Sequence, residues 1–287
     1  MRKNTNLILG HNSFFGINHL DYEKGKSNAL KFNNNYKKIV DILKFALDVD
    51  VNKIMISTVD EANNLLKIIE NDPIKEKLEF YILLPYLNKY VRKANELGIV
   101  GILTDTIKNQ SFLDNLKTGI DFLSLVKKKN LKEFLNLLIS VELRPFKNIK
   151  KKTVILHDAL TDILIALKME DIMQLFIKIV KEQFGCIPGF ATKNFATFNK
   201  RLINLPNDIY VLTHANALGF NMNPNKEDVE KELSNSKFKI ILMSVLASGY
   251  LKPNEALGYV SKLQMNTPEI VIGCSSTDHV RQIRNFF

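Results

Sequence analysis

The chain has little of what marks secreted and membrane proteins. It contains two cysteines in 287 residues, Cys186 and Cys274, which cannot form a disulfide framework. It has no run of about 18 or more apolar residues, the length that a transmembrane helix needs. The apolar stretch before Gly10 is only three residues long, too short for a secretory signal. We therefore expect a cytoplasmic protein that does not bind membranes.

Clustered arginines and mixed aromatic-basic motifs are also missing. The formal net charge is +10, but most lysines are scattered, apart from the triplets at 127–129 and 150–152. Scattered lysines are typical of solvated surfaces, and net charge alone indicates only non-specific association. We therefore expect nucleic acid not to be the main partner.

What the sequence does contain is a regular alternation of short apolar runs and amphipathic segments. Most of the short runs are apolar on both faces, as in strands of a parallel sheet that helices cover. Between them, 36–47 places Ile39, Leu43 and Ala46 on one helical stripe. The candidate strands are 7–9, 53–57, 80–84, 100–104, 153–157, 187–191, 209–213, 239–243 and 269–273.

This alternation over the whole length predicts an α/β fold, a TIM (β/α)8 barrel in one domain of residues 1–287. No GxGxxG follows the first run and no Walker sequence is present, which excludes two common open-sheet folds. Nine candidate strands are one too many for the barrel, so one of them lies outside the ring. The longest connection, about 106–151, has helical periodicity and predicts an enlarged βα connection.

The loops after the last two candidate strands carry small and hydroxyl residues, "SVLASGYL" at 244–251 and "CSSTDHVRQ" at 274–282. In (β/α)8 barrels these two loops often bind a phosphate, with a helix N-terminus completing the site. Gly249 and Gly273 would let the backbone approach a ligand closely. Arg281 would add positive charge or face solvent. The helix cap would be Ser275, Ser276 or Thr277. We expect a phosphorylated small-molecule ligand here, and the alternative is an ordinary capped helix.

Three segments resemble the aldo-keto reductase superfamily: "ILMSVLASGYL", "IVIGCSSTDHVRQ" and, more loosely, "GFATKNF". The first two resemble that family's seventh and eighth strands with their nucleotide-binding turns. The resemblance covers about 185–287 and implies a TIM barrel that binds NADP. The nucleotide-contacting positions that it implies are Ser244, Leu246, Gly249, Gly273, Ser275, Ser276, His279 and Gln282.

The residues that carry out catalysis in that family are mostly absent. Carbonyl reduction there uses a tyrosine, a lysine, an aspartate and a histidine. Here "ISTVDEANN" offers Asp60 as its nearest acid and no tyrosine, and "LLPYL" ends without a lysine. Only His157 stands where the family places its histidine. The resemblance therefore implies a divergent enzyme, an oxidoreductase in which His157 polarises a small carbonyl compound.

Histidines gather at the predicted C-terminal ends of the strands, where barrel enzymes place catalytic residues. His157 or His214 could serve as an acid–base catalyst at neutral pH. Alternatively, His11, His157 and His214 could bind a metal with a carboxylate such as Asp105, although no metal-binding spacing supports this and we predict no metal. Each histidine could also simply hydrogen-bond its own loop.

Lys193 supports a different enzyme class. A lysine at a barrel rim can form a Schiff base with a carbonyl substrate. With a phosphate site on the last two strands, this would be a lyase or aldolase acting on a phosphorylated substrate. A lysine just beyond its strand can equally face solvent. A third possibility is a barrel that binds a nucleotide or metabolite without turning it over.

Overall fold

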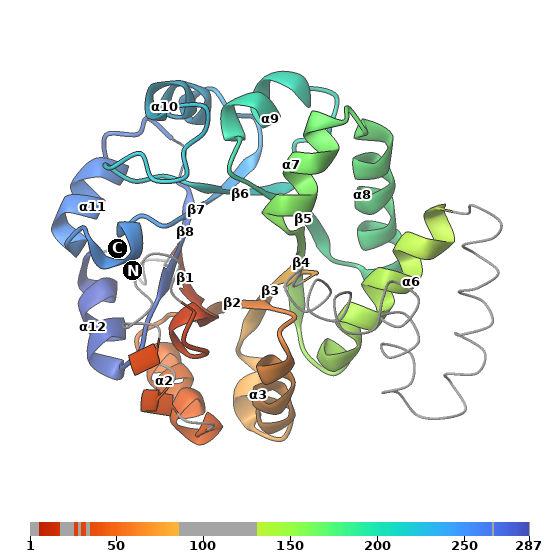
Figure 1. Cartoon of the computed structure of the whole chain (residues 1–287). Helices are drawn as coiled ribbons and strands as arrows, with labels where there is room; N and C mark the ends of the chain where they lie inside the picture. Colours follow the sequence, from red (N-terminus) through yellow and green to blue (C-terminus); the bar gives the residue numbers. More distant parts are fainter. Residues whose placement is uncertain are drawn as a thin grey trace.

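The chain forms a closed ring of eight parallel strands that follow one another in sequence order. The structure is a computed structural model and describes residues 6–17, 26–27, 30–32, 35–85, 131–265 and 267–286. Figure 1 shows the ring with helices around its outside. The predicted TIM barrel is therefore confirmed. Its strands are β1 (Leu7–Gly10), β2 (Lys53–Ser57), β3 (Glu79–Leu84), β4 (Lys151–Leu156), β5 (Ile187–Thr192), β6 (Tyr210–His214), β7 (Lys239–Met243) and β8 (Glu269–Gly273).

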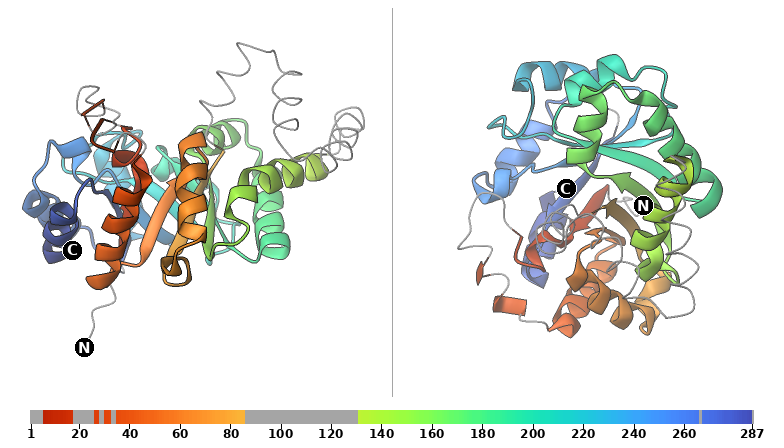
Figure 2. Two further views of the ribbon diagram at one scale, coloured as in Figure 1. Left: turned by 90° about the horizontal axis from the view of Figure 1, so that it is seen from below. Right: turned by 45° about the vertical axis from the view of Figure 1, so that its right-hand side comes forward.

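The helices form an outer layer, and Figure 2 shows α2 and α3 running side by side along the strands. The helices are α2 (Tyr36–Asp48), α3 (Asp60–Glu70), α6 (Leu131–Leu143), α7 (Asp158–Ala166), α8 (Glu170–Phe184), α9 (Phe195–Arg201), α10 (Lys226–Ser234), α11 (Pro253–Val260) and α12 (Thr277–Phe286). Short 3-10 turns are η1 (His11–Ser13), η2 (Pro73–Glu76), η3 (Arg144–Phe146) and η4 (Ala247–Gly249). No helix in the described residues is long and apolar enough to cross a membrane.

Two hydrophobic clusters explain why the strands are apolar on both faces. Alternate strand residues point into the ring, and the others pack against the helices. The larger cluster lies between strands and helices and includes the predicted stripe of Ile39, Leu43 and Ala46 on α2. The ring interior is filled by Ile8, Met55, Tyr81, Ile155, Ala191, Tyr210, Leu212 and Ile241. The barrel is therefore a packed core, and ligands can approach it only at its ends.

The ring closes with eight of the nine candidate strands because β3 pairs directly with β4. The ninth candidate, 100–104, lies outside the described residues, as does Asp105. The predicted helical excursion at 106–151 is described only from residue 131, where α6 begins. The connection ends before residue 151, the predicted boundary, because Lys151 is already the first residue of β4.

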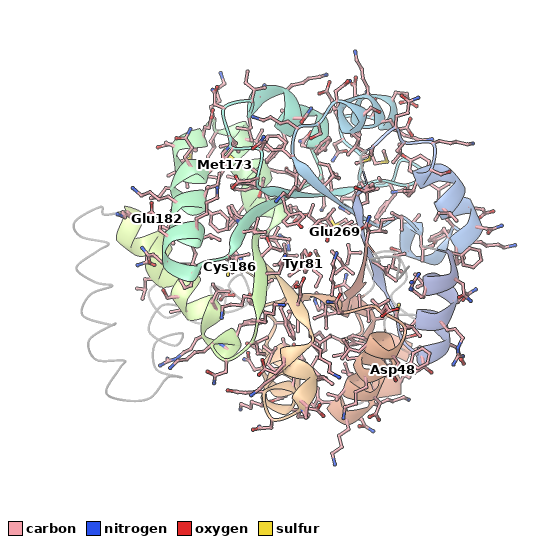
Figure 3. The ribbon with its side chains drawn as sticks, turned by 180° about the vertical axis from the view of Figure 1, so that it is seen from behind. Asp48, Tyr81, Met173, Glu182, Cys186 and Glu269 are labelled. Carbon is pink, nitrogen blue, oxygen red and sulfur yellow. The ribbon has the colours of Figure 1, made fainter. Side chains whose placement is uncertain are left out.

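Charged and phenolic side chains occupy the N-terminal end of the barrel. Lys53 forms an ion pair with Glu269, and the Tyr81 hydroxyl donates to Glu269 Oε1 at 2.9 Å. Figure 3 labels Tyr81 and Glu269 near the centre of the ring. Burial, and then the charge of Glu269, raise the pKa of Tyr210 to about 12 and that of Tyr81 further. This end of a barrel generally serves stability, so the functional site is expected at the opposite end.

Candidate functional site at the C-terminal mouth of the barrel

Three sequence-predicted residues face the C-terminal mouth on neighbouring strands. Along β4, β5 and β6, side chains alternate between the interior and the helix layer. One interior residue on each strand belongs to the central cluster, and the residue two positions later points the same way. The interior residues are Ile155, Ala191 and Leu212, and the later ones are His157, Lys193 and His214. The fold therefore brings these three candidates to one rim, as the sequence predicted from their positions at strand ends.

His157 is the N-cap residue of α7, not the last residue of β4 as the sequence predicted. Its Nδ1 lies 2.6 Å from Oδ1 of Asp158. The backbone N–H of Ala159 donates to the same carboxylate oxygen at 2.8 Å. The first turn of α7 therefore fixes a histidine and a carboxylate in contact at the mouth.

Asp158 also contacts the adjacent strand. Its Oδ2 lies 3.5 Å from Nζ of Lys193, which follows β5. One helical turn later, Asp162 accepts hydrogen bonds from the Thr192 hydroxyl at 2.5 Å and from the Lys193 N–H at 3.2 Å. Two carboxylates on one face of α7 thus hold the end of β5, one through the backbone and one through the lysine side chain. Their spacing in "HDALTD" is the sequence signal that could have revealed them.

The two carboxylates of α7 have pKa values shifted in opposite directions. Burial raises the pKa of Asp158, but the hydrogen bond and charge of His157, followed by Lys193, outweigh burial and hold it well below its usual range. Burial raises the pKa of Asp162, and the hydrogen bond from Thr192 only partly opposes this. Acid–base sites commonly contain two carboxylic acids whose pKa values are shifted in opposite directions.

Lys193 lies in a charged and hydrated setting. Its side chain is 44% exposed and its amine lies beside Asp158. A Schiff-base lysine needs an apolar or cationic environment that favours the neutral amine. Lys193 instead lies beside a carboxylate and is partly exposed. This setting favours a positioning role at the rim over the lyase or aldolase hypothesis.

The histidines at the mouth do not form a metal site in the part of the chain that the structure describes. There, no three histidine, cysteine, aspartate or glutamate side chains come close enough to hold an ion. Nδ1 of His157 faces Asp158, and Nδ1 of His214 lies 3.0 Å from the Ser244 hydroxyl. His11 is buried in η1, with its ring 5.5 Å from that of Phe15. Each of these three histidines therefore has a local structural contact.

The loop after β7 has unusual backbone conformations. Ser244, Ala247 and Ser248 all have positive φ angles, as does Gly249 at 96°. Positive φ is costly for residues other than glycine and concentrates where backbone amides bind ligands. The loop begins at Ser244, next to His214 on β6. The contact between Ser244 and His214 therefore connects the loop after β7 with the end of β6.

The turn after β8 presents hydroxyl, imidazole and ammonium groups. Ser276 caps α12 by accepting a hydrogen bond from the His279 N–H at 3.2 Å, which decides among the three predicted caps. The Ser275 hydroxyl is buried and lies 3.2 Å from Nδ1 of His279. Lys31, from the connection between β1 and α2, donates to the same hydroxyl at 3.4 Å. Sequence reasoning missed Lys31 because it comes from the other end of the chain, 244 residues away.

Gly273 lies close to the side chain of Ser13 in η1. A Cβ at this position would lie 2.7 Å from the Ser13 hydroxyl of η1, closer than side chains tolerate. Gly273 pairs in register with Gly10, so two residues without side chains face each other where β1 meets β8. The side chain of Ser13 in η1 therefore lies directly beside the Cα of Gly273.

The remaining predicted residues lie around this turn or away from it. Leu246 is partly buried against the core. Arg281 is exposed, pairs with Asp278 at 2.8 Å and stacks on Phe45 of α2, so its charge is already engaged. Gln282 is exposed on α12. Asp60 is exposed as the first residue of α3 and lies beyond the end of β2.

Burial protects the one cysteine in this turn. Burial raises the pKa of Cys274 to about 12, which leaves about a thousandfold less thiolate than an unperturbed thiol at the same pH. We expect iodoacetamide at pH 8 to leave Cys274 unmodified in the native protein and to alkylate it after unfolding in urea, as peptide mass spectrometry would show. Rapid labelling of the native protein would indicate that the β8 turn opens.

Comparison with known proteins supports the fold. No protein-family model matches the sequence, and a search of curated proteins finds no match. Two solved structures, both of provisionally named aldo-keto reductases of Pseudomonas aeruginosa, align with 98% of this chain. Their TM-scores are 0.59 and 0.60 at 12% identity, and 89% and 88% of their chains are covered. The fold is aldo-keto-reductase-like.

The alignment extends the resemblance from its C-terminal third to the whole barrel. At 12% identity it concerns the fold alone. Function therefore depends on the residues at the mouth of this aldo-keto-reductase-like barrel, because one fold supports many chemistries. His157, the one residue that the sequence resemblance matched to a catalytic histidine, lies with its Nδ1 2.6 Å from Oδ1 of Asp158.

Proposed function

We propose that this barrel is a divergent aldo-keto-reductase-like enzyme that binds NADP(H) at the loops after β7 and β8 and reduces a small carbonyl compound at His157. The observation that carries the proposal is the group of polar atoms around Ser275. Its hydroxyl, the Lys31 ammonium and the His279 ring lie at the N-terminus of α12, where free backbone N–H groups attract anions.

These residues fit a nucleotide phosphate. A phosphate offers acceptor oxygens and negative charge, and this turn presents donors and a cation. Next to it, the positive φ angles of Ser244, Ala247 and Ser248 turn the backbone of the β7 loop sharply. Ser13 fills the space at Gly273, so the phosphate would contact the Ser275–His279 side of the turn.

The other half of the proposal places the carbonyl at the His157 rim. When bound, a reduced nicotinamide supplies a hydride to the carbonyl carbon. This chain's own residues then have to polarise and protonate the carbonyl oxygen. His157, with Asp158 at its Nδ1, is an acid–base group at the mouth that can do so. The contact between His214 and Ser244 joins this rim to the β7 loop.

A fluorescence titration tests the proposal. NADPH emission should change saturably as protein is added, with a dissociation constant within the range of about 1 μM to 1 mM that is usual for enzymes and their substrates. The 2′,5′-ADP fragment should compete, because it carries the phosphates without the nicotinamide. Absence of saturable binding would contradict the proposal. Binding without NADPH consumption across a panel of aldehydes and ketones would instead support a barrel that binds the nucleotide without turnover.

A further inference from the structure

We propose that His157 transfers the proton in this barrel through Nε2, and that Asp158, held by Lys193, positions it by accepting the Nδ1 proton. This inference deepens the proposed function and rests on it for the identity of the reaction. The sequence has no tyrosine at the end of β2 and no lysine at the end of β3 to act as an acid–base pair. The proposal gives this role to His157 and Asp158, with Lys193, where β4 and β5 end and α7 begins.

The distances around Nδ1 of His157 decide which atom carries the proton. Two partners are within reach: Asp158 Oδ1 at 2.6 Å and the Ala159 backbone nitrogen at 3.4 Å. The first requires Nδ1 to be a donor, and the second requires it to be an acceptor. The Ala159 N–H already donates to Asp158 Oδ1 at the shorter distance of 2.8 Å. Nδ1 therefore has a close acceptor and no need to serve as a helix cap.

The choice at Nδ1 fixes the chemistry of the other ring nitrogen. With Nδ1–H donated to a carboxylate, Nε2 is the ring nitrogen left to exchange a proton with a ligand. The His157 side chain is 25% exposed, and it extends the inward-facing row of β4 to the mouth. In this proposal, Nε2 is the ring nitrogen that meets a ligand at the mouth.

Asp158 is held on several sides and so keeps a fixed orientation. Its side chain is 15% exposed, and its second oxygen faces Lys193 Nζ at 3.5 Å. Asp162 holds the backbone of Lys193 through that residue's N–H. Lys193 is thus anchored at its backbone by one carboxylate and at its amine by the other. Fixed supporting contacts of this kind keep a catalytic side chain in its productive geometry.

The proposed step balances as an ordinary carbonyl reduction. A bound reduced nicotinamide would supply the hydride for the new C–H bond at the carbonyl carbon, and the C=O π electrons would then reside on the carbonyl oxygen. His157 Nε2 gives its proton to that oxygen, which forms the O–H bond of the alcohol. The ring is left neutral, with its proton on Nδ1, and recovers the Nε2 proton from water. In alcohol oxidation the same atom accepts the proton.

The tautomer of His157 tests the assignment without any cofactor or substrate. Long-range ¹H–¹⁵N spectra distinguish a protonated from an unprotonated ring nitrogen, and the His157→Gln variant identifies the signal. We expect neutral His157 to carry its proton on Nδ1. A neutral ring protonated on Nε2, with Nδ1 accepting from Ala159, would overturn the proposal and leave His157 as a helix cap.

Two matched variants separate positioning from a general helix effect. Asp158 lies in the first turn of α7, and the exposed Asp171 lies in the first turn of α8. Asp158→Ala should move the His157 proton from Nδ1 toward Nε2, and Asp171→Ala should leave it in place. An unchanged tautomer in Asp158→Ala would count against the proposal, and a poorly folded variant would leave the wild-type spectrum to decide.

The outcome is separable from that of the NADPH titration, because the tautomer is measured on the free protein. An Nδ1–H tautomer without NADPH binding would retain the acid–base pair and discard the oxidoreductase. NADPH binding with the Nε2–H tautomer would retain the oxidoreductase and discard the acid–base pair. In carbonyl reduction, His157→Gln should lower kcat by about 10²- to 10⁴-fold, the usual contribution of a proton-transferring residue, with the affinity for NADPH unchanged.

Discussion

Replacing Glu269 with alanine is expected to lower the free energy of unfolding by about 3–5 kcal/mol, the usual cost of removing one partner from a buried ion pair. The side chains of Glu269 and Lys53 are only 12% and 18% exposed, so Lys53 would be left charged and largely out of water. The Tyr81 hydroxyl would also lose its acceptor at the closed end of the barrel. Both losses act at the N-terminal end, away from the mouth.

Urea unfolding followed by circular dichroism would measure this change. Glu182 provides the control, because its pair with Lys178 is 4.0 Å long and both side chains are more than half exposed. Glu182→Ala should change stability by less than about 1 kcal/mol. The double variant Lys53→Met, Glu269→Leu should recover part of the loss, since apolar residues can replace a buried pair. Equal stabilities for Glu269→Ala and the Glu182 control would show that the buried pair does not hold the barrel end together.

The fold was predictable because the apolar pattern is strong and local. A helix such as α8, from Glu170 to Phe184, buries one stripe, and the strands are apolar on both faces because helices and the packed ring interior cover them. The count of strands was not predictable in the same way. The run at 100–104 has the composition of a buried strand, and only the direct pairing of β3 with β4 shows that the ring closes without it. Pairing is a long-range property that periodicity does not contain.

The candidate site was predictable only as far as strand ends reveal it. His157, Lys193 and His214 could be identified because each follows an apolar run, and the fold then brings them to one rim. Their partners were not visible, because contacts such as Lys193 with Asp158 depend on how α7 packs against β5. Gly273 shows the same limit in reverse. A glycine in a loop indicates a close approach, but the sequence does not say that Ser13 makes it.

Reversing the charge of Lys31 is expected to weaken NADPH binding by about 10- to 100-fold. Lys31 donates to the Ser275 hydroxyl at 3.4 Å, which places its ammonium at the turn where the nucleotide phosphate is proposed to bind. Lys31→Glu removes a charge-assisted hydrogen bond, worth about 1.5–3 kcal/mol, and adds repulsion toward an anion. The same fluorescence titration measures the change as a shift in dissociation constant.

Lys147 provides a control of equal charge. It is an exposed lysine between η3 and β4, at the N-terminal end of the barrel, so Lys147→Glu changes the net charge of +10 by the same amount. It should alter the dissociation constant by less than about threefold at 0.15 M salt, where charges more than about 8 Å apart are largely screened. If both variants weaken binding equally, the attraction comes from the overall charge of the protein and not from Lys31. If only Lys31→Glu weakens binding of 2′,5′-ADP, and it does not weaken binding of adenosine, which has no phosphate, the β8 turn recognises phosphate.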